Sequence, residues 1–181
     1  MTFTFKVEEK DYLAHQLYVA SKSDFVRKRR LRNTWIITLL YIGCGLLFYF
    51  RHKPFAGIVF VVLGLLWLVL YPMWQRYSYK KQYIKIVHES LKDRFGKSGT
   101  LEIDNEYLLL KSDGSESRLT TKEVEAVNEI AEVVMIKLRN GQSIILPKDN
   151  CSDLDNLIAR LKLLAAHLSV PYNLETDWNW K

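Results

Sequence analysis

The side chains that most often carry chemistry, histidine and cysteine, are few and scattered in this chain. The histidines show neither the H-x-x-x-H nor the H-E-x-x-H spacing that brings ligating groups onto one face of a helix. They stand at His15, His52, His88 and His167. The two cysteines form no C-x-x-C pair. We therefore expect surface or interface roles for the histidines, and we predict no metal site and no cofactor.

A thiol–base pair is the one nucleophilic arrangement to consider, between Cys151 and His167. If a helix separates them, its rise places them about 24 Å apart, which is too far for proton transfer. The acidic residues of the C-terminal half alternate with apolar positions, as solvated strand faces do. They are Glu102, Asp104, Glu106, Glu123, Glu125, Glu129 and Glu132. With no nucleophile, base and orienting group together, we predict no catalytic residue and no enzyme. Turnover abolished by Cys151→Ala would revive that alternative.

Two long apolar runs dominate the first half of the chain. Residues 34–50 and 54–74 contain no charged side chain, and as helices they would span roughly 25 and 30 Å, about the thickness of a bilayer core. Neither run has the polar stripe that a helix of a soluble protein normally keeps. The segment FRHKPFAG between them is expected to be a tight turn, with Pro54 in the first turn of the second helix. We predict a membrane hairpin of helices 34–50 and 55–74.

Glycines inside the apolar runs favour close helix packing. Gly43-Cys44-Gly45 has no preceding strand and no lysine, so a phosphate-binding loop is excluded. Gly57 and Gly64 are seven residues apart and share a face of the second helix, where they would let another helix approach closely. That helix could belong to the same chain or to a second copy.

Basic residues near the ends of the apolar runs predict the orientation of the hairpin. Nine of them flank its outer ends: Arg27, Lys28, Arg29, Arg30, Arg32, Arg76, Lys80, Lys81 and Lys85. Only Arg51 and Lys53 stand in the turn. The positive-inside rule then places both termini in the cytoplasm, as in a multi-pass protein of the inner membrane, with the nine basic side chains at the membrane interface.

The rest of the chain falls into four further segments. Residues 1–33 would form a strand, in which Phe3, Phe5 and Val7 share one face, and then a juxtamembrane helix from about Glu9. Residues 75–97 would continue the second apolar helix outward. In that lead-out Ile84, Val87, Leu91 and Phe95 form one stripe, and Gly96 is a plausible stop. Residues 98–170 read as strands followed by a helix, and 171–181 as a tail without periodicity.

The strands of the C-terminal half are short, mostly alternating segments separated by turn residues. They are GTLEID, YLLLKS, ESRLT, VNEIA, EVVMIKLR and QSIILPK, with turns at Asp104-Asn105, Asp113-Gly114-Ser115 and Asn140-Gly141. Asn140-Gly141 is the strongest hairpin signal. Ser152 or Asp153 would cap the final helix, whose apolar face is formed by Leu154, Leu157, Ile158, Leu161, Leu164, Ala165 and Leu168.

This order of segments resembles that of the bacterial YcxB-like membrane proteins. The resemblance covers nearly the whole chain: FTFKVEEKDYLAHQLYVASKS, the apolar hairpin, VVMIKLRNGQSIILPKDNCSD and a last helix, with Ile144–Lys148 as its most recognisable part. Six strands closed by one helix also outline a small pleckstrin-homology-like barrel. The expected fold is thus α+β: a two-helix transmembrane hairpin with a cytoplasmic pleckstrin-homology-like β-barrel or sandwich closed by a C-terminal helix. The resemblance implies no activity.

Charge separates the remaining functions. Residues 1–98 carry 17 basic and 6 acidic side chains, whereas residues 99–181 carry 9 and 14. The basic excess is juxtamembrane, where it serves topology and anionic lipid, so we predict no nucleic-acid partner. The leading hypothesis is a non-enzymatic membrane protein whose β-domain contacts a protein partner or itself, with the lipid bilayer as its other partner. The alternative is an anionic-lipid or small-ligand binding module at the headgroup layer.

Overall fold

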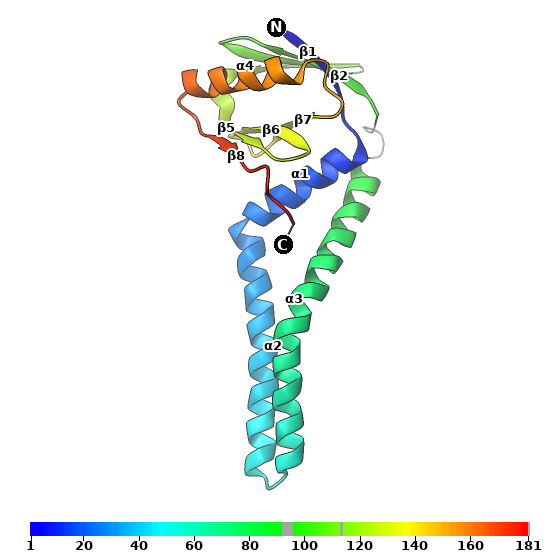
Figure 1. Ribbon diagram of the computed structural model, residues 1–181, viewed down its shortest axis with the longest axis vertical. Helices are drawn as coiled ribbons and strands as arrows, with labels where there is room; N and C mark the ends of the chain where they lie inside the picture. The colour runs from blue at the N-terminus through cyan, green and yellow to red at the C-terminus, as the bar shows by residue number, and fades with distance from the viewer. Residues whose placement is uncertain (92–95, 113, 181) are drawn as a thin grey trace. The chain divides into compact units, whose positions relative to one another are not determined.

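The computed structural model describes residues 1–91, 96–112 and 114–180. These residues form two compact units, which are described separately (Figure 1). The first unit comprises Met1–Gln16 and Ile84–Asn179, and it is called the β-domain below. The second comprises Leu17–Tyr83 and Trp180, and it is called the helical unit. The boundaries between the units fall inside helices α1 (Glu9–Lys22) and α3 (Pro54–Leu91).

The helical unit is built on α2 (Asp24–Phe50) and α3, which lie side by side (Figure 1). The predicted turn between them is confirmed: Arg51–Lys53 connect the two helices, and Pro54 is the first residue of α3. Helix α2 begins about ten residues before the apolar run, at the cap formed by the Ser23 hydroxyl, which accepts from the backbone N–H of Val26 at 3.5 Å. The five basic residues within 27–32 are therefore helical.

Both helices are long and apolar enough to cross a membrane. A buried core helix of a soluble protein would satisfy the same criteria of length and composition. Here, however, only 17% and 11% of the most apolar windows of α2 and α3 are buried. Helix α3 also runs on through Pro72, as expected for a lead-out that continues the same helix. Of its predicted stripe, Val87 is buried and Ile84 exposed, whereas the Leu91 side chain and Phe95 lie outside the described residues.

The β-domain contains two four-stranded sheets. The first has the order β1-β2-β3-β4 and the second β7-β6-β5-β8. Their bounds are β1 Thr2–Lys6, β2 Ser98–Ile103, β3 Tyr107–Ser112, β4 Ser115–Thr120, β5 Val124–Glu129, β6 Val133–Leu138, β7 Ser143–Pro147 and β8 Tyr172–Leu174. All six predicted strands of the C-terminal half are present. The hairpin between β6 and β7 turns at Gly141, whose φ of 86° is the conformation that favours glycine.

The expected closed barrel is not found in the described part of the chain: the two sheets form an open arrangement. They meet at one corner, where Phe5 forms an isolated bridge with Cys151 and the Ser152 backbone N–H donates to the carbonyl oxygen of Thr4 at 2.9 Å. At another corner a 3-10 turn, Thr121–Glu123, leads from β4 into β5. Residues 1–6 were expected in a separate N-terminal segment. In the structure they belong to the first sheet, because β1 pairs antiparallel with β2.

Helix α4 (Leu154–His167) spans the gap between the sheets on one side of the β-domain (Figure 1). Asp153 is its cap, and the Asp153 side chain accepts from the backbone N–H of Asn156. Its buried residues are Leu157, Leu161, Leu164 and Ala165, all members of the predicted apolar face. They join a core whose largest fully buried side chains include Leu101, Ile103, Leu108, Ile136, Leu138 and Leu146.

The tail contains a strand that the sequence did not predict. Residues Tyr172–Leu174 form β8, which pairs parallel with β5. The Asn173 side-chain amide donates to the Asn128 side-chain oxygen at 2.8 Å, so polar groups rather than an apolar pattern accompany this pairing.

Candidate functional site

The inward-facing side chains of β2, β3 and β4 form three cross-strand rows. The side chains become larger from the first row to the third. The first row is Gly99, Ser112 and Ser115; the second is Leu101, Leu110 and Ser117; the third is Ile103, Leu108 and Leu119. The third row helps to fill the core, since Ile103 and Leu108 are fully buried. The first row has no large side chain. The sheet is therefore well packed at one end and hollow at the other.

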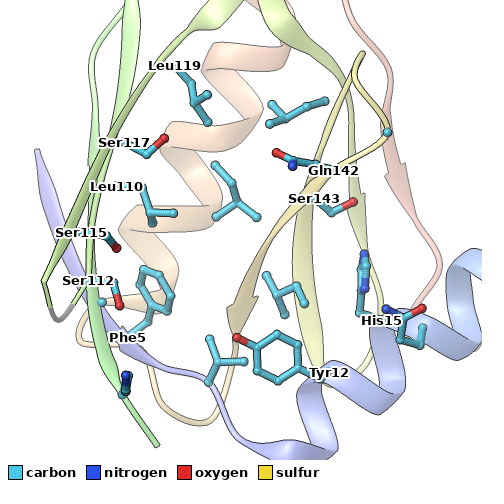
Figure 2. A pocket seen from close by; sticks show the side chains of 18 residues that line it. Phe5, Tyr12, His15, Leu110, Ser112, Ser115, Ser117, Leu119, Gln142 and Ser143 are labelled. Atoms are coloured by element: carbon cyan, nitrogen blue, oxygen red, sulfur yellow. The ribbon is translucent and has the colours of Figure 1, made fainter. Parts of the chain in front are cut away.

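A pocket of about 810 Å³ occupies the hollow end of the β-domain (Figure 2). In Figure 2 Leu110, Ser117 and Leu119 lie on one wall and Gln142 and Ser143 on the other, with α4 visible behind. Phe5 and the first turns of α1, with Tyr12 and His15, close one end of the pocket. The volume lies within the range of about 300–1,000 Å³ that is typical of small-molecule sites.

The lining of the pocket combines an apolar surface with neutral polar groups. The apolar part is Phe5, Val7, Leu110, Leu119, Leu138, Ile144 and Ile145. The hydroxyl and amide groups come from Tyr12, Ser112, Ser115, Ser117, Ser143, Gln142 and Gln16. Lys97 is the one lysine or arginine in the described lining, which contains no carboxylate. Among the described residues, no hydrogen bond is formed by the hydroxyls of Ser115, Ser117 and Ser143.

His15 contributes the least satisfied polar group of the pocket. Both of its ring nitrogens are shielded from solvent and have no hydrogen-bond partner among the described residues. Burial lowers the pKa of His15 below its ordinary value, so the neutral imidazole is favoured. A neutral ring presents one donor and one acceptor. The predicted surface or interface role gave no indication that His15 faces a pocket.

A buried polar cluster lies elsewhere in the β-domain, at the end of β5. Lys148 Nζ is 2.7 Å from Glu129 Oε1, and the Tyr172 hydroxyl donates to Glu129 Oε2. Burial alone would raise the pKa of Glu129, but the bonds from Lys148 and Tyr172 outweigh burial and lower it. The expectation of a solvated Glu129 is wrong, since only 6% of the residue is exposed. The cluster joins β5, β8 and the residue after β7, so its role is structural.

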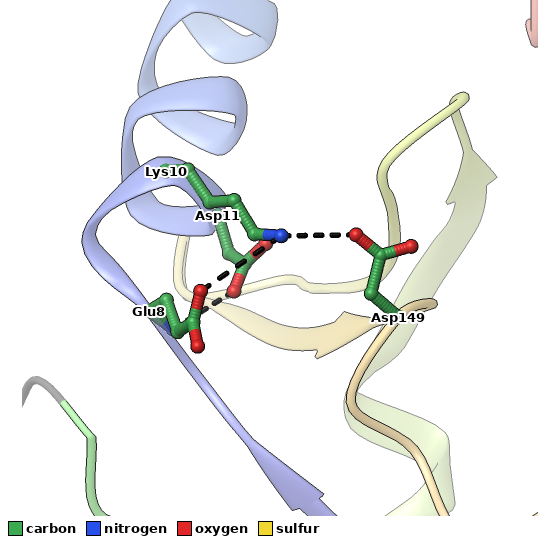
Figure 3. Close-up of polar contacts among 4 residues, drawn as sticks. All are labelled: Glu8, Lys10, Asp11 and Asp149. Atoms are coloured by element: carbon green, nitrogen blue, oxygen red, sulfur yellow. Dashed lines mark hydrogen bonds and ion pairs between the residues drawn. The ribbon is translucent and has the colours of Figure 1, made fainter.

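The start of α1 carries a second set of charged contacts (Figure 3). The buried carboxylate of Asp11 accepts from the backbone N–H of Glu8 at 2.8 Å, as the third residue of a helix does in a capping box. Burial raises the pKa of Asp11 above its ordinary value. Lys10 Nζ lies 2.9 Å from Asp149 Oδ2 and 3.8 Å from Glu8 Oε2, and these groups are largely exposed. The exposed Lys10–Asp149 pair is the contact of this set that reaches the segment that follows β7.

The structure places both predicted packing glycines against α2 of the same chain. A Cβ on Gly57 would lie 2.8 Å from the Gly45 carbonyl oxygen, and one on Gly64 would lie 3.1 Å from Tyr41 Cβ. Gly45 faces Gly57 and Val61, whereas nothing lies within 4 Å of a Cβ built on Gly43. Within this chain, α2 is the helix that packs on both glycines.

Eight of the nine predicted interface residues are exposed: Arg27, Lys28, Arg29, Arg32, Arg76, Lys80, Lys81 and Lys85. Arg30 is the exception and is half-buried. Its Nε lies 3.3 Å from Gln75 Oε1, and its guanidinium carbon lies 5.4 Å from the ring centroid of Trp180. The Trp180 indole N–H also donates to the Arg76 carbonyl oxygen at 3.2 Å. Arg30 therefore packs inside the helical unit, which its place in a run of basic residues did not indicate.

Metal-ligating groups do not gather in the described residues, where no group of three or more His, Cys, Asp or Glu side chains could hold an ion. Cys44 and Cys151 are both free thiols. His167 is the last residue of α4, whereas Cys151 precedes that helix, so the two stand at opposite ends of it as the sequence suggested.

Comparison with known proteins adds no assignment: no family model matches the chain, and no curated protein or solved structure matches it.

Proposed function

We propose that this chain is a non-enzymatic integral membrane protein that presents its β-domain in the cytoplasm for contact with a protein partner or with a second copy. The exposure of the apolar helices carries this proposal. Large side chains such as Leu40, Leu65 and Val69 are more than half exposed on α2 and α3. A surface of this size and polarity is unfavourable in water and favourable in a bilayer.

The proposed topology is a hairpin across the inner membrane with both termini on the cytoplasmic side. The exposed basic residues at the outer ends of α2 and in α3 support it. The order of a strand, a helix, an apolar hairpin, a β-domain and a last helix is also what the YcxB-like resemblance leads one to expect. That resemblance remains part of the proposal.

Cysteine labelling tests the topology directly. In a Cys44→Ala, Cys151→Ala background, Lys53→Cys marks the turn and Asp177→Cys marks the tail; both positions are exposed. A membrane-impermeant maleimide should modify the turn cysteine in intact cells and the tail cysteine only after permeabilisation. The opposite pattern would reverse the orientation, and release of the protein from membranes by alkaline carbonate would refute the hairpin.

The protein-contact part of the proposal draws support from the acidic β-domain and from β4, an edge strand whose side chains are mostly exposed. Crosslinking in the native membrane, followed by mass spectrometry, should give crosslinks from the β-domain to another protein or between two copies of this chain. Solubilised complexes without a reproducible partner or oligomer would contradict it.

The second candidate function is binding of anionic lipid at the headgroup layer, which the eight exposed basic side chains favour. Because β1 belongs to the β-domain, the experiment requires the full chain rather than a C-terminal fragment. Reconstituted in nanodiscs, the chain should retain anionic lipid over zwitterionic lipid in a salt-sensitive way. Replacing Arg27, Lys28 and Arg29 with glutamine should abolish that preference, and an unchanged preference would exclude this candidate.

A further inference from the structure

We propose that the pocket between the two sheets of the β-domain binds an uncharged amphipathic small molecule, with a hydrocarbon body and hydroxyl or amide groups. This goes beyond the proposed function and does not depend on it, since it concerns the interior of the β-domain and holds for either orientation in a membrane. Three properties of the pocket carry it: its volume, a lining with a single charged side chain, and serine hydroxyls without a partner among the described residues.

The unfilled volume follows from the residue types at inward positions. In a small β-barrel or sandwich these positions usually carry large apolar side chains, which fill the interior. Here Ser112, Ser115 and Ser117 stand at three of them on β3 and β4. Next to them the Phe5 ring packs directly on Gly99, because a Cβ added at Gly99 would lie 2.9 Å from that ring. The small residues at these inward-facing positions therefore account for the pocket of about 810 Å³.

The apolar part of the lining suits a hydrocarbon body. Leu110, Leu119 and Phe5 come from the first sheet, and Leu138 and Ile144 from the second. In the absence of a ligand these apolar side chains face water in the pocket. A hydrocarbon chain between the sheets would remove that apolar surface from water.

The near absence of charged side chains from the lining disfavours ionic ligands. Phosphate and sulfate sites use arginine or clustered lysine, and sites for organic cations use carboxylates or aromatic cages. The described lining of this pocket offers Lys97 alone and no carboxylate. Lys97 is exposed, so it does not provide a desolvated counter-ion for a carboxylate ligand. An uncharged ligand is the class that remains.

The polar groups of the pocket match hydroxyl or amide groups on such a ligand. The hydroxyls of Ser115, Ser117 and Ser143 have no partner among the described residues, and Ser115 and Ser117 are exposed on β4 where the pocket opens. A hydroxyl or amide group on a ligand can both donate to and accept from such serine hydroxyls. His15 lies at the α1 end of the pocket, while the serines stand on the strands (Figure 2).

Photocrosslinking of the full chain in nanodiscs tests the proposal. The probe is a 1-monoacylglycerol that carries a diazirine in a twelve-carbon chain, and the crosslinked residues are mapped by mass spectrometry. We expect adducts on the lining segments 110–112, 115–119 and 138–145. Unlabelled 1-monolauroylglycerol should compete, whereas dodecanoate and dodecyl phosphate, which share the chain but carry charge, should compete much less.

Two phenylalanine variants on β4 form a matched pair. Ser117→Phe places a ring in the pocket and should reduce the adducts there about tenfold, because it removes the space for the chain. Glu116→Phe adds the same ring on the opposite, exposed face of β4 and should leave them unchanged. If Ser117→Phe does not fold by circular dichroism, Ser115→Leu is a smaller filling of the same cavity with the same expected direction.

The proposal is overturned if the adducts are confined to α2 and α3, if they persist in a folded cavity-filling variant, or if dodecanoate competes as well as monolauroylglycerol. The last result would leave a ligand site but would replace the uncharged class by an anionic one. Each of these outcomes is independent of the labelling experiment on membrane topology.

Discussion

Gly45 and Gly57 are in backbone contact across the helical hairpin. A Cβ on Gly57 would lie 2.8 Å from the Gly45 carbonyl oxygen, and a Cβ on Gly45 would lie 2.9 Å from the Gly57 carbonyl oxygen. Real Cβ atoms do not approach a backbone oxygen this closely, so any larger residue at either position must push the helices apart. The two helices also stack Phe48 on Phe60, with ring centroids 5.2 Å apart.

Gly57→Leu should therefore destabilise the hairpin, by about 1–3 kcal/mol for an overpacked contact. Gly43→Leu is the matched control, because nothing lies within 4 Å of a Cβ at that position on α2. Thermal unfolding in detergent should show a lower melting temperature for the first variant and little change for the second. Equal effects would mean that the helices do not pack through this face.

Lys148 and Lys10 each form an ion pair. The two pairs should differ sharply in their contribution to the free energy of unfolding. The Lys148–Glu129 side chains are 14% and 8% exposed, whereas Lys10 and Asp149 are 53% and 71% exposed. Lys148→Met leaves a buried carboxylate without its cation, which should cost about 3–5 kcal/mol of unfolding free energy. Lys10→Met should leave the melting temperature of the full chain unchanged. A similar loss from both variants would contradict the structural role of the buried cluster.

Glu129 should make the β-domain sensitive to acid. Its folded pKa lies below the ordinary value of 4.5, despite burial, because Lys148 and Tyr172 bond the charged form. The stability it contributes is therefore fully present above pH 4.5 and is lost as the pH falls through the lower folded pKa. Melting temperatures measured from pH 6 to pH 3 should fall less steeply for Glu129→Gln than for the wild-type chain. Parallel profiles would refute the assignment.

Tyr172 should produce the opposite dependence at alkaline pH. Burial, together with donation to the Glu129 carboxylate, raises its pKa above the ordinary value of 10.0. The stability from the neutral phenol is then fully present below pH 10 and decreases as the pH rises through the folded pKa. Tyr172→Phe should be less stable at pH 8 and should lose this part of the alkaline decline. Ultraviolet titration of the phenol absorbance, with the remaining tyrosines as the reference, checks the pKa itself.

The elements with a strong local pattern could be predicted from the sequence. The alternation of Phe3, Phe5 and Val7 predicts β1, and all three are buried. Asn140-Gly141 predicts the β6–β7 hairpin, which the structure contains. The predicted turn at Gly114 is also present, with a φ of 78°, while Asp113 lies outside the described residues. In each case the signal is contained in a few adjacent residues.

The features that depend on tertiary pairing could not be predicted. Strand β8 has no apolar alternation and joins β5 through Asn173 and Tyr172, which contact polar groups far away in the sequence. Glu129 resembles other exposed strand carboxylates until Lys148 and Tyr172 are placed beside it. The pocket depends on the register that aligns Ser112 with Ser115 and Leu110 with Ser117. Serines at inward-facing strand positions would have indicated the pocket. In β4, however, apolar and polar residues alternate too little for its inward-facing positions to be recognised from the sequence.

Substitutions at Asp11 distinguish two contributions to folding stability: the hydrogen bond that caps α1, which stabilises, and the burial of a charge, which destabilises. Its Oδ2 accepts from the backbone N–H of Glu8 at 2.8 Å, and burial raises its pKa. Because the folded pKa is raised, the stability linked to this carboxyl is fully present below its ordinary pKa and is lost at neutral pH, where the charge must be buried. Asp11→Asn keeps an acceptor oxygen without the charge and should match or exceed the wild-type stability at pH 7.

Asp11→Ala removes the acceptor and should cost about 1 kcal/mol, as the loss of a capping contact does. Circular dichroism melting at pH 7 compares the three chains, and a second series at pH 4 supplies the control. At position 11 only the wild-type aspartate can be protonated, and its protonation removes the buried charge. The advantage of the asparagine variant over the wild-type chain should therefore shrink at the lower pH. An asparagine variant as unstable as the alanine variant at pH 7 would show that the carboxylate charge itself stabilises the start of α1.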